Sequence, residues 1–278
     1  MALGIIGGSG LYQLPGLLGA EWRTVTTPWG SPSDQLLHGT LGDTELVFLP
    51  RHGRGHRLAP SELNARANIA ALKAAGCSAI VSLSACGSFR EALPPGSFVL
   101  VNQIIDRTRG RANSFFGDGI VAHVSLADPM CARLRGIVAD TSVACHIGGT
   151  YLAMEGPQFS TRAESRAYRA AGLDVIGMTA MPEAALAREA ELCYQTVAMV
   201  TDFDSWHDGD AVDLAQVVAV LGANAERART LVAAVATGWT DAPCACHRAL
   251  DHAVITDRAA WPAATVDRLR GVAGRVLQ

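Results

Sequence analysis

The chain has 278 residues, of which 49% are apolar, so it can bury a sizeable core and is not expected to be disordered. Its 23 basic and 26 acidic residues give a formal charge of -3, which excludes a global positive field for nucleic acid or an anionic membrane surface. Any anion that the protein binds must therefore be held by a local arrangement of donors.

Apolar runs and amphipathic segments alternate along the chain and predict strands and helices in turn. The run 4–8 ends in a glycine turn, the run 46–49 ends at Pro50, and the segment 61–75 has helix start and stop signals. Further strands are expected at 79–83, 98–105, 174–178 and 196–201, and further helices at 162–171, 182–191 and 212–235 before a short terminal helix. The alternation predicts one α/β domain, residues 1–278, with a central mixed β-sheet flanked by helices.

The cysteines and the first residues bear on the cellular compartment. No basic region precedes the first apolar run, so we expect no signal peptide and a cytoplasmic location. The seven cysteines are an odd set scattered through apolar stretches, which favours reduced, mostly buried thiols over a disulfide framework. Cys244 and Cys246 could form a redox or metal site, but only His247 is near them in the sequence. We expect no metal and no cofactor.

Polar residues follow several of the predicted strands. Ligands of α/β sheets collect outside the carboxyl ends of the strands, so these residues are expected to converge. Hydroxyl, guanidinium and imidazole groups together with backbone N–H groups freed by glycine are suitable donors for a tetrahedral oxyanion. Each turn alone could be an ordinary turn, and none is a Walker loop or a G-x-G-x-x-G motif. The strand ends are Gly7-Gly8-Ser9-Gly10, Arg51-His52-Gly53, Ser84-Ala85-Cys86-Gly87 and Met178-Thr179.

Two carboxylates form a second group. Asp202 and Asp204 follow the apolar run 197–200 and project to the same side if the strand geometry persists. Close carboxylates raise the pKa of one of the pair, and such an acid can stay protonated at neutral pH. The alternative interpretation is a helix cap or a surface turn.

Eight runs, in order between residue 4 and about residue 236, combine these groups. They are Gly4-Ile-Ile-Gly-Gly-Ser-Gly10, Thr27-Pro-Trp-Gly-Ser-Pro-Ser33, Arg51-His-Gly-Arg-Gly-His56, Ala85-Cys-Gly-Ser-Phe-Arg-Glu91, Asp106-Arg-Thr108, Glu155-Gly-Pro-Gln-Phe-Ser160, Met178-Thr-Ala-Met-Pro-Glu183 and Thr201-Asp-Phe-Asp-Ser-Trp206. The runs resemble those of the 5'-methylthioadenosine phosphorylases in the trimeric purine nucleoside phosphorylase family. The resemblance implies the fold of that family and cleavage of a nucleoside by inorganic phosphate, which is a co-substrate and not a cofactor.

The resemblance also implies roles for individual residues. The phosphate-binding residues would be Ser9, Arg51, His52, Ser84, Ala85 and Thr179, in agreement with the strand ends. Met178 would lie against the ribose, Phe159 would stack on the base, and Ser160 and Phe203 would lie beside it. The catalytic residues would be Asp202, as the acid at purine N7, and Asp204, which would orient the base through its 6-amino group. His56 and His123 would line the 5' pocket, with His123 supplied by the neighbouring subunit.

The resulting hypothesis is phosphorolysis of 5'-methylthioadenosine to adenine and 5-methylthioribose 1-phosphate. The alternatives are another 5'-modified 5'-deoxyadenosine, such as a 5'-halo compound, and a 6-oxopurine nucleoside, although the phosphorylases of that class typically have Asn where Asp202 stands. A nucleoside-binding regulatory module is the alternative that is not an enzyme. Two features differ from the family pattern. Ala65 replaces a usual tyrosine, and the similarity is thin over residues 240–278, an extension that we expect to help complete the 5' pocket.

The resemblance further implies a homotrimer or a dimer of trimers. Phe115 and Phe116 lie in a polar stretch shortly before His123, and exposed loop aromatics are often covered by a partner. The alternative is that this loop folds back on its own core. The expected partners are thus a purine nucleoside, phosphate and further copies of the chain, with neither nucleic acid nor membrane among them.

Overall fold

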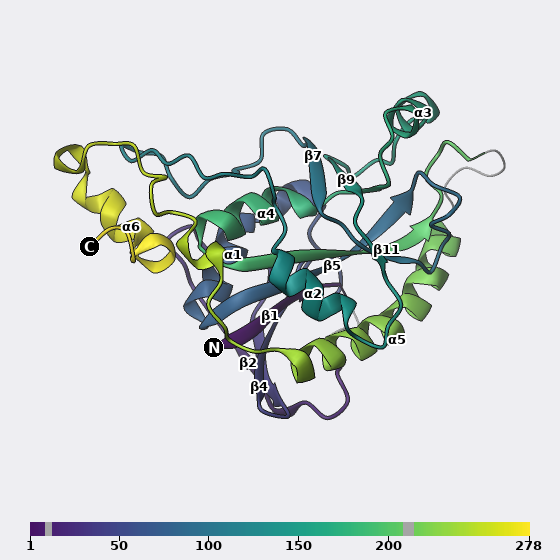
Figure 1. Cartoon of the computed structure of the whole chain (residues 1–278), viewed down its shortest axis with the longest axis horizontal. Helices are drawn as coiled ribbons and strands as arrows, with labels where there is room; N and C mark the ends of the chain where they lie inside the picture. The colour runs from purple at the N-terminus through teal and green to yellow at the C-terminus, as the bar shows by residue number, and fades with distance from the viewer. Residues whose placement is uncertain (9–12, 208–213) are drawn as a thin grey trace.

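A central β-sheet with helices on both faces forms the computed structural model (Figure 1), which describes residues 1–8, 13–207 and 214–278, the side chains of residues 214 and 216 excepted. In this described part the sheet has eleven strands, both parallel and antiparallel. The strands are β1 (Ala2–Gly7), β2 (Leu18–Arg23), β3 (Leu36–Leu41), β4 (Thr44–Pro50), β5 (Cys77–Ser88), β6 (Phe98–Leu100), β7 (Gln103–Arg107), β8 (His146–Ile147), β9 (Thr150–Met154), β10 (Val175–Gly177) and β11 (Cys193–Asp202). The α-helices are α1 (Ala65–Ala74), α2 (Ala132–Ala139), α3 (Arg162–Ala170), α4 (Ala180–Glu189), α5 (Leu214–Gly238) and α6 (Ala263–Ala273), with short 3-10 turns at Pro60–Glu62, Ala245–Arg248 and Arg258–Ala260.

Side chains of the central strands alternate between two hydrophobic cores. In β1, Ile6 packs in the core that contains α1 and α4, whereas Leu3 and Ile5 pack in the core that contains α2 and α5. Because both faces are covered, every residue of β1 is buried, as is usual for parallel strands between helical layers. The predicted α/β domain with a mixed sheet flanked by helices is confirmed.

The longest strand, β5, is the point at which the sheet divides. On one edge β5 pairs in parallel with β1 as far as Ser82, and the same edge pairs antiparallel with β10 at Gly87 and Ser88. On the other edge β5 runs parallel to β11 as far as the pair Gly87 and Asp202. Residues 83–86 therefore lie where β1 and β10 diverge. A divergence of this kind opens a crevice at the carboxyl ends of the strands.

Several predicted boundaries differ from the structure. The expected strand 98–105 is wrong, because this run forms β6, which pairs with β11, and β7, which pairs with β9. Between them the Asn102 side chain accepts a hydrogen bond from the Gly149 N–H at 2.9 Å, and the Asn102 N–H donates to the Gly149 carbonyl at 3.1 Å, which separates the two strands. The expected helix 61–75 begins only at Ala65, after Asn64 caps it. The expected start at 212 lies outside the described residues.

Within the described chain, none of the helices combines the length and the apolar character needed to cross a membrane. Of the seven cysteines, five are buried, which agrees with the predicted mostly buried side chains.

The prediction that Phe115 and Phe116 are exposed is wrong. Phe115 is 1% exposed and packs edge-on against Trp29, with their ring centroids 4.6 Å apart. Its backbone N–H donates to Glu189 at 2.6 Å, and Phe116 is half-buried against the same core. The loop folds back on its own subunit, so these aromatics give no support for a subunit interface.

The burial of Phe115 predicts a folding defect for Phe115→Ala. Removing a fully buried phenylalanine should lower the free energy of unfolding by about 3–5 kcal/mol, as measured by urea denaturation. Phe116→Ala, at the half-buried neighbour, is the matched control and should cost less. A Phe115→Ala protein that keeps its stability but loses subunit association would contradict the core position.

Candidate active site

Three hydroxyl groups meet where β1 and β10 diverge. The Ser84 Oγ atom, on β5, lies 3.2 Å from Thr179 Oγ1 and 3.1 Å from the Tyr151 hydroxyl. Thr179 is the residue before α4, and its side chain makes no capping hydrogen bond. Both Ser84 and Thr179 are buried, and Ala85 follows on the same strand. The structure therefore brings the predicted residues Ser84, Ala85 and Thr179 together. Ser9 lies outside the described residues.

Arg51 follows the last residue of β4, and a buried ion pair with Glu183 fixes its side chain near the Ser84 hydroxyl cluster. Its Nε atom donates to Glu183 Oε1 at 2.6 Å, and both residues are 3% exposed. Nη2 donates to Ser82 Oγ at 2.6 Å and to Glu183 Oε2 at 3.2 Å, while Nη1 donates to the Leu83 carbonyl at 2.9 Å. These bonds use four of the five guanidinium N–H groups, so one Nη1 proton makes no hydrogen bond to the described residues.

His52 and His56 form a stacked pair next to Arg51. Their ring centroids are 4.3 Å apart and the rings are inclined by 11°. Nδ1 of His52 lies 2.9 Å from the Leu58 carbonyl and donates to it. Burial, with the charge of Arg51, lowers the pKa of His52 to about 4, so the ring is neutral at pH 7 and its Nε2 accepts. His52 thus offers an acceptor to a protonated phosphate oxygen and no second ring donor.

The two predicted aspartates lie at the carboxyl end of β11, where Asp202 is the last residue of the strand and Asp204 follows it. The Asp202 Oδ2 atom accepts from Thr201 Oγ1 at 2.8 Å. Burial raises the pKa of Asp202, and Asp204 adds to the rise, although the Thr201 hydrogen bond opposes it. Asp204 is buried, which raises its pKa as well, and the hydroxyls of Ser165 and Ser160 partly oppose this. Asp204 Oδ2 forms no hydrogen bond of normal geometry within the described residues.

Gly87 on β5 leaves the space that the aspartates occupy. A Cβ atom placed on Gly87 would lie 3.0 Å from Asp202 Oδ1, 3.1 Å from Ile176 Cγ2 and 3.2 Å from Asp204 Cβ. Real Cβ atoms rarely approach neighbours this closely, so a side chain at Gly87 would displace the carboxylates. The glycine brings both acids against β5.

The structure connects only some of the remaining predicted substrate residues to the aspartates. Ser160 is joined to the aspartate loop, because Ser205 Oγ donates to its carbonyl at 2.9 Å. Met178 packs on Gly156, where an added Cβ would lie 2.4 Å from its sulfur. Phe203 is half-buried and stacks on His207 at 4.8 Å, whereas Phe159 is 48% exposed. Phe203 lies between the two aspartates in the sequence, whereas Phe159 lines a surface pocket with Met154 and Tyr168.

His123 is not placed with the other predicted residues in this subunit. It is exposed, and its backbone N–H donates to the Ala253 carbonyl at 2.8 Å. The C-terminal tail that it pairs with packs through α6 against α1, at the left of Figure 1, away from the carboxyl end of β11. Neither His123 nor residues 240–278 reach the aspartates of their own subunit, so a role across subunits stays a prediction.

Three residues of this region were missed from the sequence. Glu183 belongs to a recognised run, but nothing in the sequence pairs it with Arg51, 132 positions away. Tyr151 has the pattern of an ordinary buried strand residue. Arg111 donates to the carbonyls of Met178 and Glu155, both at 2.6 Å, and so ties together the loops around the site. The polar stretch around Arg111 is the sequence signal that could have identified this residue.

Comparison with known proteins gives consistent results. The family model described as "Phosphorylase superfamily" matches residues 2–237. Proteins named S-methyl-5'-thioadenosine phosphorylase are 55% identical in Cereibacter sphaeroides, over 99% of this chain and 98% of the relative, and 56% identical in Rhodospirillum rubrum, over 99% and 97%. These matches extend through the tail, so the similarity is not confined to residues 4–236.

Solved structures agree with the sequence relatives. The crystal structure of a methylthioadenosine phosphorylase from an Antarctic soil metagenomic library has a TM-score of 0.92 at 45% identity, covering 97% of this chain and 98% of that chain. The Schistosoma mansoni methylthioadenosine phosphorylase in complex with adenine has a TM-score of 0.80 at 40% identity, covering 85% and 91%.

The buried ion pair predicts strong coupling between Arg51 and Glu183. Arg51→Met or Glu183→Met alone leaves an uncompensated buried charge and should lower the free energy of unfolding by about 3–5 kcal/mol. The double variant removes both charges and should cost clearly less than the sum of the two. Urea denaturation of all four proteins checks this. Additive losses would mean that the two side chains do not interact in solution.

Proposed function

The chain belongs to the phosphorylase superfamily, and from this premise we propose that it cleaves 5'-methylthioadenosine with inorganic phosphate. The products are adenine and 5-methylthioribose 1-phosphate. The sequence relatives and solved structures compared above are named for this activity, and the arrangement of the site supports it in three ways.

The first support is a set of donors suited to a phosphate group. Ser84 and Thr179 place two hydroxyls 3.2 Å apart, and the remaining Nη1 proton of Arg51 adds a charged donor. His52 accepts a hydrogen bond from a protonated phosphate oxygen, and the backbone N–H of Ala85 donates a hydrogen bond to the phosphate. Ser9 belongs to the same set as an expectation, because it follows β1.

The second support is the position of Asp204 Oδ2, which is buried and makes no hydrogen bond of normal geometry to the described residues. The hydroxyls of Ser165 and Ser160 lie near this carboxylate, and a ligand that brings a well-placed donor would add the missing hydrogen bond. The 6-amino group of adenine is such a donor, whereas a 6-oxopurine offers none there. Phe159 and Phe203 would cover the base, Ser160 would lie beside it, and Met178 would contact the ribose. His56 would lie toward the 5' substituent.

The spacing of these groups along β5 carries the proposal. The cluster of three hydroxyls is centred at Ser84. The aspartates pack against Gly87, three residues further along the strand. Three residues of strand span roughly 10 Å. We place the phosphate at the Ser84 end of this stretch, the purine at the Asp202 end and the ribosyl group between them.

The chemistry follows from these positions. A phosphate oxygen bonds to C1' as the bond between C1' and N9 breaks, through a transition state with positive charge on the ribosyl group. Burial raises the pKa of Asp202, which favours the protonated form, and in that form Asp202 delivers its proton to N7 of the departing base. Phosphate becomes an ester and gives up a proton, which restores the acid for the next turnover.

The direct test of the function is adenine release from a panel of nucleosides. 5'-Methylthioadenosine, adenosine, a 5'-halo-5'-deoxyadenosine and inosine are compared with and without phosphate. We expect phosphate-dependent release with the highest kcat/KM on 5'-methylthioadenosine. Release without phosphate would exclude a phosphorylase, preference for the halo compound or inosine would reassign the substrate, and binding without turnover would indicate a regulatory module.

The acid role of Asp202 predicts the behaviour of Asp202→Asn. An amide cannot deliver the proton, so kcat should fall about 10²–10⁴-fold. In the wild-type protein kcat should decrease as pH rises through the elevated pKa of Asp202, because the acid is then ionised, and this alkaline limb should vanish in the variant. Asp43→Asn, on the exposed turn between β3 and β4, is the control. A variant within a few-fold of wild type would remove Asp202 from this role.

We also propose that the site is completed across subunits of a homotrimer or of a dimer of trimers, in the cytoplasm. His123 and residues 240–278 lie away from the aspartates of their own chain, so only a neighbouring chain could bring them to a 5' pocket. The seven free thiols suit a reducing compartment.

A mixing experiment tests the shared site. Asp202→Asn and His123→Ala proteins, each inactive alone, are combined under conditions in which subunits exchange. Partial recovery of activity is expected, because some hybrid sites then contain neither lesion. If exchange is verified by mass and no activity returns, His123 lies outside the shared site.

A further inference from the structure

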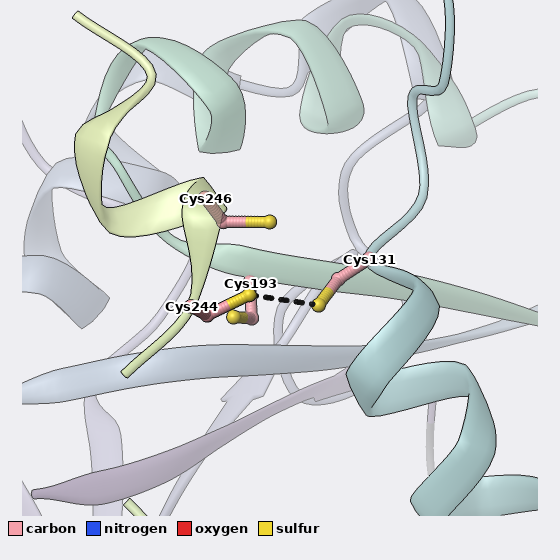
Figure 2. A group of neighbouring side chains, drawn as sticks. All are labelled: Cys131, Cys193, Cys244 and Cys246. Carbon is pink, nitrogen blue, oxygen red and sulfur yellow. Dashed lines mark hydrogen bonds between the residues drawn. The ribbon is translucent and has the colours of Figure 1, made fainter. Parts of the chain in front are cut away.

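Four cysteines from distant parts of the sequence meet at the amino end of β11. Cys193 is the first residue of β11, Cys131 caps the start of α2, and Cys244 and Cys246 lie in the segment that follows α5 (Figure 2). Their sulfur atoms all lie within 4.8 Å of one another. We call these residues, Cys131, Cys193, Cys244 and Cys246, the four-cysteine cluster.

The spacing of the sulfurs matches a single tetrahedral metal ion. Zinc binds thiolate sulfur at about 2.3 Å, and the sulfurs of a regular tetrahedron of that radius are about 3.8 Å apart. The Cys131 and Cys244 sulfurs are 3.7 Å apart, joined by the dashed line in Figure 2. The S–S bond of a disulfide is about 2.05 Å long, so the Cys131 and Cys244 sulfurs are not bonded to each other. All four sulfurs lie close to one another, whereas two disulfides would form two separate pairs.

We propose that the four-cysteine cluster holds one zinc ion in a closed structural site. Four thiolates fill the coordination of zinc and leave no open position for substrate or water, as in structural and not catalytic zinc sites. Three of the four side chains are buried and Cys244 is half-buried, which protects such a site from solvent.

Charged groups around the cluster suit its occupied form. A zinc ion with four thiolates carries a net charge of -2, and two arginines lie beside it. Nη1 of Arg188 is 3.9 Å from the Cys246 sulfur. Arg133 is adjacent to Cys193 and Cys244, and its Nε and Nη2 atoms are buried without a hydrogen bond of normal geometry in the described part of the chain. The backbone N–H of Leu134 donates to Cys131 Sγ at 3.4 Å.

The position of the cluster indicates what the ion does. It connects the segment after α5 to the first residue of β11 and to α2, and so fixes the beginning of residues 240–278 on the body of the domain. β11 has 10 residues, so the site is about 30 Å from Asp202 at the other end of the strand. The ion therefore stabilises the tail and takes no part in catalysis.

The first experiment measures metal and thiols in the purified protein. The chain is purified under reducing conditions without chelator, and its zinc content and its thiols after denaturation are determined. We expect about one zinc per chain and all seven thiols. No zinc, even after incubation of the reduced protein with Zn²⁺, overturns the proposal. Three thiols without zinc would show instead that the cluster forms two disulfides.

The second experiment uses variants and a spectroscopic probe. Cys244→Ser should lose the zinc and lower Tm, whereas Cys145→Ser, a half-buried cysteine outside the cluster, should keep both. Should Cys244→Ser fail to fold, the wild-type protein loaded with Co²⁺ decides. Four thiolates give strong sulfur-to-cobalt charge transfer and the visible bands of a tetrahedral ion. A spectrum of octahedral cobalt, or zinc retained by Cys244→Ser at the wild-type level, would overturn the proposal.

Discussion

The buried ion pair between Arg51 and Glu183 is the interaction on which the site depends. Arg51 comes from the end of β4 and Glu183 from α4, and the guanidinium also holds the Ser82 side chain and the Leu83 carbonyl of β5. Glu183 in turn accepts from the Tyr194 hydroxyl on β11 at 2.9 Å. A buried charge is tolerated only with such partners, so the four elements are held in one arrangement. Ser84, at the centre of the hydroxyl cluster, lies two residues beyond Ser82 on β5.

One long strand, β5, carries both groups of the proposed site. β5 loses β1 as a neighbour after Ser82 and gains β10 at Gly87, so residues 83–86 have no strand partner on this edge within the described part of the chain. Ser84 lies at the beginning of this opening. Gly87 lies at its end and admits Asp202 and Asp204. In the proposed site, the separation between phosphate and purine is therefore set by the backbone of β5.

The sequence predicted the parts of the site that follow directly from strand ends. Arg51, Ser84, Thr179 and Asp202 each follow an apolar run. Arg51 and Asp202 lie at the ends of strands in parallel pairs, which meet at one edge, whereas Thr179 reaches Ser84 because β10 runs antiparallel to β5. Glu183 and Tyr151 could not be found in this way, because a buried partner is recognisable only from the contact that it makes. The predicted exposure of Phe115 was wrong because its sequence neighbours are polar, whereas its ring packs inward against Trp29.

The four-cysteine cluster shows the same limit more strongly. The sequence predicted no metal site, since Cys244 and Cys246 have no partner at a recognisable spacing. Cys131 and Cys193 come from a helix start and a strand start, 113 and 51 positions before Cys244, and only the packing of α2 and β11 brings them to it. Long-range convergence of this kind leaves no local pattern.

The most direct test of this account compares the two ends of β5. The KM for phosphate and the KM for 5'-methylthioadenosine are measured in Ser84→Ala and in Asp204→Asn. The account predicts opposite selectivity: Ser84→Ala raises mainly the KM for phosphate, and Asp204→Asn raises mainly the KM for the nucleoside and weakens the preference for adenosine over inosine. Equal changes of both constants in both variants would contradict the division of the site along this strand.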